Sequence, residues 1–249
     1  MNYLVLDTST EGATVGVSAN GHPIVSANIE LPRRHGRDLV PRLRDVLEQA
    51  GLRPMDLDLI AAGLGPGSFT GLRIGLAAAK TLAYAAEAAI LGIDSLEGIA
   101  ANAPPDVLRV SVIADAQRGD LYTADFHREV AGQPLKRMSP TRIESLTDWN
   151  RRIEPGTYAI GPALDSPKLQ PQFSERLIRA DSALNRPDAA SLLAVASSAW
   201  EQGRRCDLWS LEPLYLRRSA AEEQWDRLST SRPVPRQAPP QTTDCQHTS

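Results

Sequence analysis

The sequence lacks a strong excess of either charge. Its 249 residues include 30 acidic and 27 basic side chains, which gives a formal net charge of -3. A chain this close to neutrality has no long-range attraction, as a whole, for nucleic acid or an anionic membrane, so any RNA contact would be local or made through a partner. Apolar residues make up 42% of the chain, enough to fill the cores of one large or two small domains.

Long apolar runs and paired cysteines are also missing. No run of about 18 apolar residues occurs, and the apolar start Met1–Leu6 meets Asp7 without the basic flank and longer apolar core of a signal peptide. The two cysteines, Cys206 and Cys245, stand apart from each other and from other candidate ligands, which argues against a disulfide framework or a metal cluster. We therefore expect a cytoplasmic protein that does not contact membranes.

Motifs of common hydrolases are absent as well. The sequence contains no His-Glu-x-x-His, no Gly-x-Ser-x-Gly and no Gly-Lys-Ser/Thr ending of a P-loop. One of the four histidines, His35, lies in a basic stretch at 33–37, where we expect a structural or solvated role. The residues alone thus give no support for a peptidase site.

Alternating apolar segments predict an α/β fold with some parallel strand pairing. The helix that spans Leu39–Leu47 is expected to be capped by Asp38, to tolerate Pro41 in its first turn and to end at Gly51. The other predicted elements are strands at 3–6, 57–62 and 89–93, a hairpin at 14–27 around Asn20-Gly21, a long helix at 68–88 and a short helix at 96–102.

The second half of the chain repeats the order of the first at an offset of about one hundred residues. Val112–Asp115 corresponds to Leu4–Asp7, because each is an apolar strand that ends in aspartate and is followed by a turn and a second strand. Further correspondences join 121–126 to 13–18, 158–162 to 60–66, and the Ala-rich segment 189–200 to 75–86. We predict two similar lobes; the alternative is that any two α/β segments share such features.

The stretch GLGPGSFTGLRIG at 63–75 concentrates five glycines. In a helix that begins near Ser68, expected to be its N-cap, small residues recur in steps of four at Gly67, Gly71, Gly75, Ala79 and Ala83. Phosphate binding at the helix N-terminus would not explain the two glycines inside the helix, which together cost roughly 1 to 2 kcal/mol. The stripe indicates close packing, either on the chain's own sheet or against a partner.

Several motifs resemble those of the TsaB family: LDTST at 6–10, GLGPGSFTGLRIGLA at 63–77, GIDSLEGIA at 92–100, DAQRGDLYTADF at 115–126 and PLYLR at 213–217. The resemblance covers residues 2–228, with little signature at 130–186. It implies an α/β fold of two similar actin-like (ribonuclease H-like) lobes. It also implies a non-catalytic subunit that binds and activates a TsaD-like paralogue, which transfers a threonylcarbamoyl group to adenosine 37 of tRNA, with a TsaE-like ATPase completing the complex.

The resemblance also implies where the sites lie. The long helix would form the partner interface, for TsaD or for a homodimer, through Gly67, Gly71, Leu72, Arg73, Ile74, Gly75 and Ala79. Arg73 would either bridge to a partner carboxylate or be an ordinary solvated arginine. A vestigial nucleotide cleft would contain Asp7, Thr8, Ser9 and Asp115.

We expect no catalytic residue, no metal and no cofactor bound by this chain alone, while the complex uses ATP and magnesium. The His-x-x-x-His metal pair of TsaD-type relatives is missing, since no two of His22, His35, His127 and His247 are four residues apart. Two alternatives remain: a small actin-fold kinase or peptidase that uses Asp7 or Asp115, and a homodimeric scaffold unrelated to tRNA.

The expected domain boundaries are a first lobe at 1–105 and a second at 106–228, whose final segment could pack back on the first lobe. Residues 229–249 are rich in Pro, Ser, Thr, Gln and Arg, and this composition predicts a disordered tail. The segment Ala220–Leu228 before it, with Trp225 and Leu228 three residues apart, suggests a short terminal helix.

Overall fold

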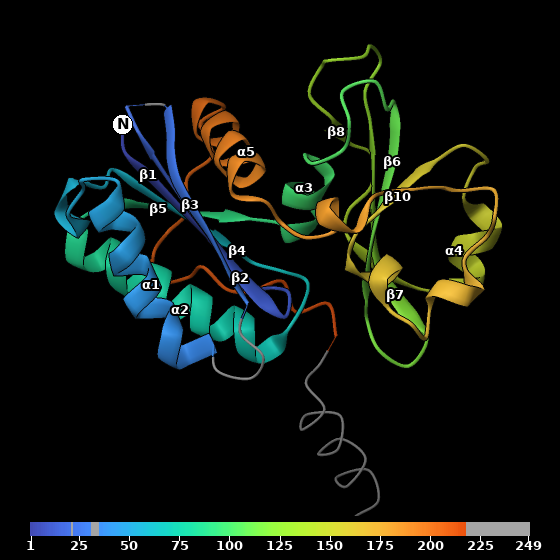
Figure 1. The fold of residues 1–249 in the computed structure, drawn as a ribbon, viewed down its shortest axis with the longest axis horizontal. Coiled ribbons are helices and arrows are strands. Elements are labelled where there is room, and N and C mark those ends of the chain that lie inside the picture. Colours follow the sequence, from blue (N-terminus) through green and yellow to red (C-terminus); the bar gives the residue numbers. More distant parts are fainter. Residues whose placement is uncertain (21, 31–34, 218–249) are drawn as a thin grey trace, which may run out of the picture. The chain divides into compact units, whose positions relative to one another are not determined.

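The chain folds around two β-sheets in a computed structural model that describes residues 1–20, 22–30 and 35–217 (Figure 1). Met1–Leu216 form one compact unit. The predicted tail at 229–249, the suggested helix at 220–228 and the residues Cys245 and His247 lie outside the described residues. The lobe boundaries given above therefore stay a prediction.

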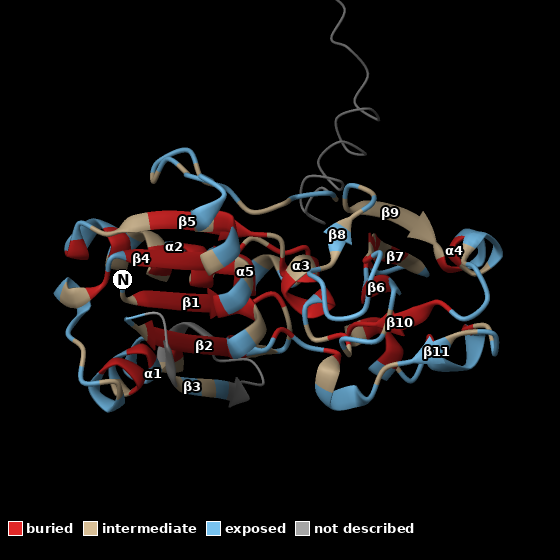
Figure 2. Cartoon of the chain, turned by 90° about the horizontal axis from the view of Figure 1, so that it is seen from above, coloured by how far each residue is buried: buried red, intermediate tan, exposed pale blue. Residues whose placement is uncertain are grey.

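The first sheet has five strands in the order β3-β2-β1-β4-β5. β1 pairs antiparallel with β2 and parallel with β4, and β4 pairs parallel with β5. β1 and β4 are buried along their whole length, as the red strands of Figure 2 show, because both faces of the sheet are covered. The strands are β1 (Tyr3–Asp7), β2 (Gly12–Ala19), β3 (His22–Glu30), β4 (Leu59–Gly63) and β5 (Ala89–Ile93).

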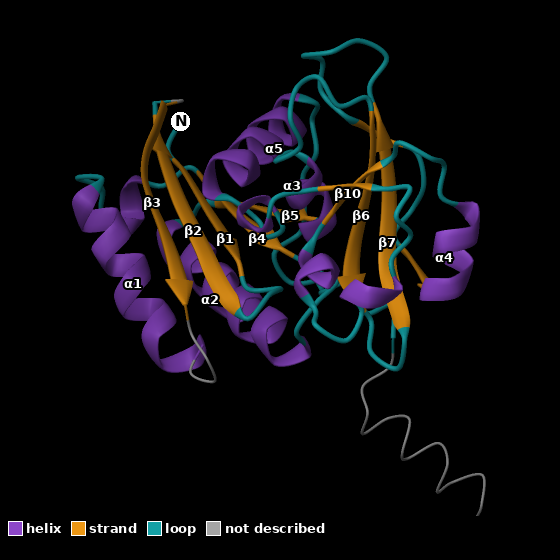
Figure 3. Ribbon diagram, turned by 45° about the vertical axis from the view of Figure 1, so that its right-hand side comes forward, coloured by secondary structure: helices purple, strands orange, loops and turns teal. Residues whose placement is uncertain are grey.

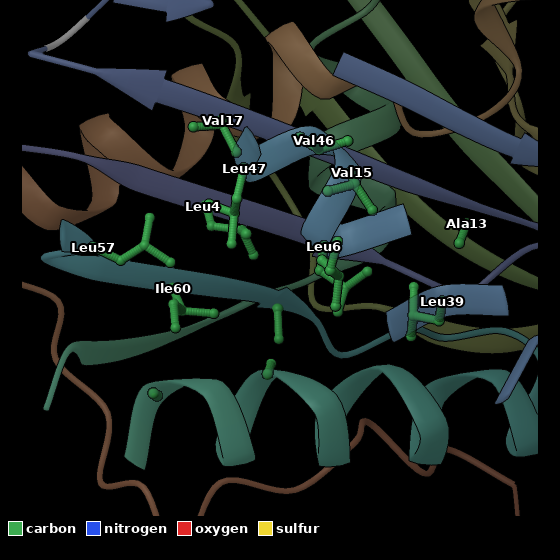
Figure 4. Packing of buried hydrophobic residues seen from close by; sticks show 14 of the residues in the cluster. Leu4, Leu6, Ala13, Val15, Val17, Leu39, Val46, Leu47, Leu57 and Ile60 are labelled. Carbon is green, nitrogen blue, oxygen red and sulfur yellow. The ribbon is translucent and has the colours of Figure 1, made fainter. Parts of the chain in front are cut away.

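Helices cover the two faces of this sheet (Figures 1 and 3). α1 (His35–Gln49) and α2 (Phe69–Ala86) lie on one face, where α2 contacts β4, β1 and β5 and α1 contacts β2 and β3. α5 (Ala189–Glu201) lies on the other face against β1, β2, β3 and β5. Figure 4 shows the core under α1 and α2, built from leucine, valine and isoleucine side chains of both layers.

Two sequence expectations concern helix ends. Asp38 does not cap α1, because the helix begins earlier, at His35, and Asp38 lies inside its first turn. For the same reason Pro41 lies in the second turn and not, as expected, in the first. Ser68 does cap α2 as predicted, since its Oγ accepts a hydrogen bond from the N–H of Gly71.

The second sheet has six strands, in the order β11-β10-β6-β7-β8 with β9 also paired to β7. α3 (Ser95–Ala100) packs on one side, and α4 (Leu146–Arg152) contributes the fully buried Trp149 to the other. The strands are β6 (Arg109–Asp115), β7 (Asp120–His127), β8 (Lys136–Arg137), β9 (Arg142–Ser145), β10 (Tyr158–Ile160) and β11 (Ile178–Arg179). Short 3-10 turns lie at Pro54–Asp56, Pro162–Asp165, Gln170–Gln172 and Ser182–Leu184.

The two sheets share one plan, which confirms the predicted duplication. In each, the first strand pairs antiparallel with the second and parallel with a later one: β1 with β2 and β4, and β6 with β7 and β10. The last predicted correspondence, between 189–200 and α2, is wrong. α5 follows β11 and packs on the first sheet, because its buried residues Leu192, Leu193 and Ala196 meet Tyr3, Val5 and Leu59 there.

Candidate functional site

The turn after β1 is closed around the carboxylate of Asp7. The side chain is 2% exposed and accepts three hydrogen bonds: from the N–H and the Oγ of Ser9 at 2.8 and 2.6 Å, and from the Oγ of Ser95 at 2.5 Å. Gly63 adjoins it so closely that a Cβ there would lie 1.9 Å from Asp7 Oδ2. Side chains and backbone of this chain therefore fill the space around the carboxylate.

Burial raises the pKa of the Asp7 carboxyl above its ordinary value. The hydrogen bonds from Ser9 and Ser95 lower this pKa but do not cancel the effect of burial, and the nearby charge of Asp94 raises it further. Ser95 in turn accepts from the N–H of Gly65 at 3.0 Å. The hydrogen bonds of Asp7 and Ser95 thus join the β1 turn, the loop after β4 and the start of α3.

Asp115, the second predicted cleft carboxylate, ends β6 of the other sheet and is exposed. Its Oδ1 accepts from the N–H of Gln117 at 2.6 Å. Gln117 and Arg118 both have positive φ, 66° and 61°, and the carboxylate braces this left-handed turn. Each of the two aspartates thus closes a turn of its own lobe, while Thr8 and Ser9 are buried beside Asp7.

The glycine stripe of α2 packs against that same β1 turn. A Cβ on Gly67 would lie 2.1 Å from the carbonyl oxygen of Ser9, and one on Gly71 would lie 2.3 Å from that of Thr8. A Cβ on Gly75 would lie 2.1 Å from Thr8 Oγ1, which donates a 2.8 Å hydrogen bond to the carbonyl of Gly71. The sequence left open whether the glycines pack on their own chain or against a partner. These distances show that they pack closely against their own chain.

The predicted interface residues consequently separate into two sets. Gly71, Leu72, Gly75 and Ala79 are buried within the chain. Arg73 is exposed, while Ile74 and Gly67 are partly exposed. The outer side of α2 has its own spacing of three and four residues, formed by Thr70, Ile74, Ala77, Thr81 and Tyr84, of which all but Ile74 are exposed.

The C-terminal segment Cys206–Leu216, here called the strap, runs along one flank of this outer side. The guanidinium of Arg73 lies 3.9 Å from the centroid of the Phe69 ring and donates from Nε to the hydroxyl of Tyr215 at 3.0 Å. Further along the helix, Lys80 Nζ donates to the carbonyl of Trp209 at 3.0 Å, and the rings of Trp209 and Tyr84 are 5.7 Å apart. The exposed fractions of Trp209 and Tyr84 are 73% and 67%.

The sequence allowed the final segment of 106–228 to pack back on the first lobe, but it indicated neither the extent of the strap nor its contacts with α2. The strap has no helical or strand periodicity, and its only signal was the motif PLYLR at 213–217. Its main-chain anchor lies within that motif, where the N–H of Leu214 donates to the carbonyl of Leu64 at 2.8 Å.

Neither a metal cluster nor a membrane-spanning helix occurs among the described residues. Across residues 1–20, 22–30 and 35–217, no group of three or more His, Cys, Asp and Glu side chains could hold a metal ion. Within those ranges no helix combines the length and the apolarity that crossing a membrane requires.

Known proteins resemble this chain in both sequence and fold. The family model of TsaD, described as tRNA N6-adenosine threonylcarbamoyltransferase, matches residues 29–162. The structure of YeaZ from Pseudomonas aeruginosa superposes with a TM-score of 0.75 at 28% identity, covering 86% of this chain and 99% of that one. This likeness agrees with the predicted fold of two actin-like lobes.

Curated relatives match over almost their whole length. The tRNA threonylcarbamoyladenosine biosynthesis protein TsaB of Bacillus subtilis (strain 168) is 28% identical over 232 residues, which cover 90% of this chain and 98% of that protein. The TsaB protein of Escherichia coli (strain K12) is 30% identical over 234 residues, which cover 92% of this chain and 98% of that protein. With this agreement in motifs, length and fold, the chain belongs to the TsaB family.

Proposed function

We propose that this chain is an accessory subunit in the biosynthesis of tRNA threonylcarbamoyladenosine. It binds a TsaD-like paralogue and enables that protein to transfer the threonylcarbamoyl group to adenosine 37 of tRNA. ATP and magnesium are used by the complex, which a TsaE-like ATPase completes. The pathway is supported by the family, whose members carry it in their names.

The observation that carries the binding role is the outer side of α2. Thr70, Ala77 and Thr81 are small and exposed, so a partner helix can approach the α2 backbone closely. At the end of this row the stacked pair Tyr84 and Trp209 stays exposed, and aromatic side chains are enriched in the energetic centres of protein interfaces. The proposed binding surface, the outer side of α2, therefore differs from the predicted glycine stripe, which packs against the β1 turn of the same chain.

The Asp7 site supports a role without catalysis. A carboxylate that orients a metal ion and water must reach them, whereas Asp7 is buried and its carboxylate accepts hydrogen bonds from Ser9 and Ser95. We expect no tight binding of magnesium ATP by the isolated chain. Tight binding in isothermal titration, lost in Asp7→Asn, would favour the rival function of a small actin-fold kinase or peptidase.

The test is reconstitution of the tRNA modification with the same organism's paralogue, adenylate-forming enzyme and ATPase. Ala77→Arg places a long cation in the middle of the outer side of α2 and should prevent co-elution with the paralogue and lower the modification rate by about tenfold or more. Ala194→Arg is the matched control, because Ala194 is an exposed alanine of α5 on the opposite face of the same sheet. Modification that proceeds equally without the chain would refute the proposal.

A further inference from the structure

Each sheet with the helices packed on it forms a lobe, and the short helix α3 contacts both lobes. It follows β5 of the first sheet, yet its buried residues Leu96, Ile99 and Ala100 pack into the core of the second sheet. It also adjoins α5, which covers the first sheet, so closely that a Cβ on Gly98 would lie 2.6 Å from Cδ2 of Leu192. Apolar contacts of α3 therefore join a helix of one lobe to the sheet of the other.

Asp94, the N-cap of α3, holds the edge of the second sheet. Its Oδ1 accepts from the N–H of Leu96 at 2.8 Å and so caps the helix. Its Oδ2 accepts from Oγ1 of Thr141, between β8 and β9, at 2.5 Å and lies 2.9 Å from Nη2 of Arg137 in β8. Arg137 Nη1 also donates to Thr141 Oγ1 at 2.9 Å. One partly buried carboxylate thus ties the start of α3 to the β8–β9 edge.

Asn102, two residues after α3, holds the segment through which the chain returns from the second sheet to α5. Its Nδ2 donates to the carbonyl of Leu184 at 2.9 Å and to that of Arg186 at 2.7 Å. In the same segment the carbonyl of Pro187 accepts from Oγ1 of Thr14, in β2, at 2.8 Å. The outgoing and the returning connection are therefore bonded to each other, and the returning one is also bonded to the first sheet.

Asn185 fixes the returning segment to the second lobe as well. Its side chain is 1% exposed, and Oδ1 accepts from the N–H of Gly161, just after β10, at 2.9 Å. Its Nδ2 donates to Oδ1 of Asp165 at 3.0 Å. Displacing this buried amide would leave a buried N–H of the backbone unpaired, which is unfavourable.

We propose that α3, with Asp94 at one end and Asn102 at the other, is a lock that makes the two lobes one rigid body. Hinge motion between lobes requires connecting segments whose φ and ψ angles are free to change. Here side chains hold both connections, so rotation of one lobe would break several hydrogen bonds at once. A partner that binds one lobe then meets the other lobe in a fixed position.

The experiment follows urea unfolding of the full chain, labelled with fluorotryptophan, by fluorine NMR. Trp149 lies in the core of the second lobe and Trp200 in α5 on the first sheet, so each reports on one lobe. Trp149→Phe and Trp200→Phe assign the two resonances. In the wild type both native resonances should disappear at the same urea concentration, because neither lobe unfolds without the other.

Arg137→Ala and Asn102→Ala each loosen one end of the lock. Each should separate the two midpoints by about 0.5 M urea or more. The Trp149 resonance should disappear first, because β8, β10 and β11 of the second sheet are only two or three residues long.

Matched controls weaken the second lobe without touching the lock. Asn150 also donates from Nδ2 to a carbonyl, that of Gln172 at 2.8 Å, but inside the second lobe. Arg109 forms an ion pair with Glu154, likewise inside that lobe. Asn150→Ala and Arg109→Ala should therefore leave the Trp149 and Trp200 midpoints equal, even where both fall together.

Two results would overturn the inference. One is a wild type whose two resonances disappear at different urea concentrations. The other is an Arg137→Ala, Asn102→Ala double variant that shows the native fluorine spectrum without urea and keeps the two midpoints equal. If the double variant does not fold, the two single variants decide by the same criterion.

Discussion

Substitution of the α2 glycines tests whether the close contact with the β1 turn governs them. Gly71→Ala would gain about 0.5 to 1 kcal/mol of helix propensity if nothing lay against the helix. Its Cβ, however, would stand 2.3 Å from the carbonyl oxygen of Thr8, so α2 or the turn must move. Such overpacking costs about 1 to 3 kcal/mol, and the hydrogen bond from Thr8 Oγ1 to the Gly71 carbonyl contributes about 0.5 to 1.5 kcal/mol more when lost.

The net expectation is a loss of about 1 to 3 kcal/mol in the free energy of unfolding, measured by urea denaturation. In a chain of this size it lowers the melting temperature by roughly 3 to 10 °C. Gly98→Ala is the matched control, since Gly98 also lies in a helix but its Cβ would meet side-chain atoms of Leu192, Cδ2 at 2.6 Å and Cγ at 3.5 Å, and no backbone. We expect a smaller loss there.

A double-mutant cycle locates the cause. In Gly75→Ala the clash is with the side chain of Thr8, whose Oγ1 would be 2.1 Å away. Thr8→Ala removes that oxygen and should recover about 1 kcal/mol of the Gly75→Ala loss, whereas it should not relieve Gly71→Ala, which meets the Thr8 backbone. A neutral or stabilising effect of either glycine substitution, or no coupling between Thr8 and Gly75, would refute the reasoning.

Three further predictions concern the carboxylates. Burial raises the pKa of Asp7 in the folded chain. As the pH rises from about 4, near the ordinary pKa of aspartate, through the raised value, the wild type should therefore lose stability relative to Asp7→Asn. If the unfolding free energies of the two proteins depend equally on pH, this prediction is wrong. Ser95→Ala removes the donor to Asp7 and the acceptor of the Gly65 N–H, and should cost about 2 to 4 kcal/mol in urea denaturation; a loss below about 0.5 kcal/mol would show that the bond is not needed. Hydrogen bonds from Arg53 lower the pKa of Asp56 to about 2. Asp56 should therefore stabilise the fold at pH values above the ordinary pKa of aspartate and lose this contribution as the pH falls toward 2. An NMR titration that gives Asp56 the ordinary pKa of aspartate would contradict this.

Much of the fold could be predicted from the sequence because its signals are local. Buried parallel strands are continuous apolar runs, as in Tyr3–Asp7 and Ala89–Ile93, and the cap of α2 needs only a serine before a helical pattern. The duplication was visible because both halves begin with a strand that ends in aspartate.

The candidate site was less predictable, because it depends on what lies opposite each residue. The spacing of Gly71 and Gly75 reveals a small face but cannot tell whether that face meets Thr8 or a partner. Likewise, an aspartate at the end of a strand looks the same whether it is open to solvent or enclosed, as Asp7 is, by Ser95 from 88 residues further along the chain. Contacts across such separations leave no pattern in one sequence.

The contact between α2 and the β1 turn has a mechanical consequence. Gly67, just before α2, lies against the Ser9 backbone, and Gly71 within α2 lies against the Thr8 backbone; Asp7 ties this turn to Ser95 at the start of α3. The helix, the turn and the start of α3 thus form one stiff body with little conformational entropy left to lose. A partner that binds the outer side of α2 therefore loses little free energy in ordering the surface that it contacts.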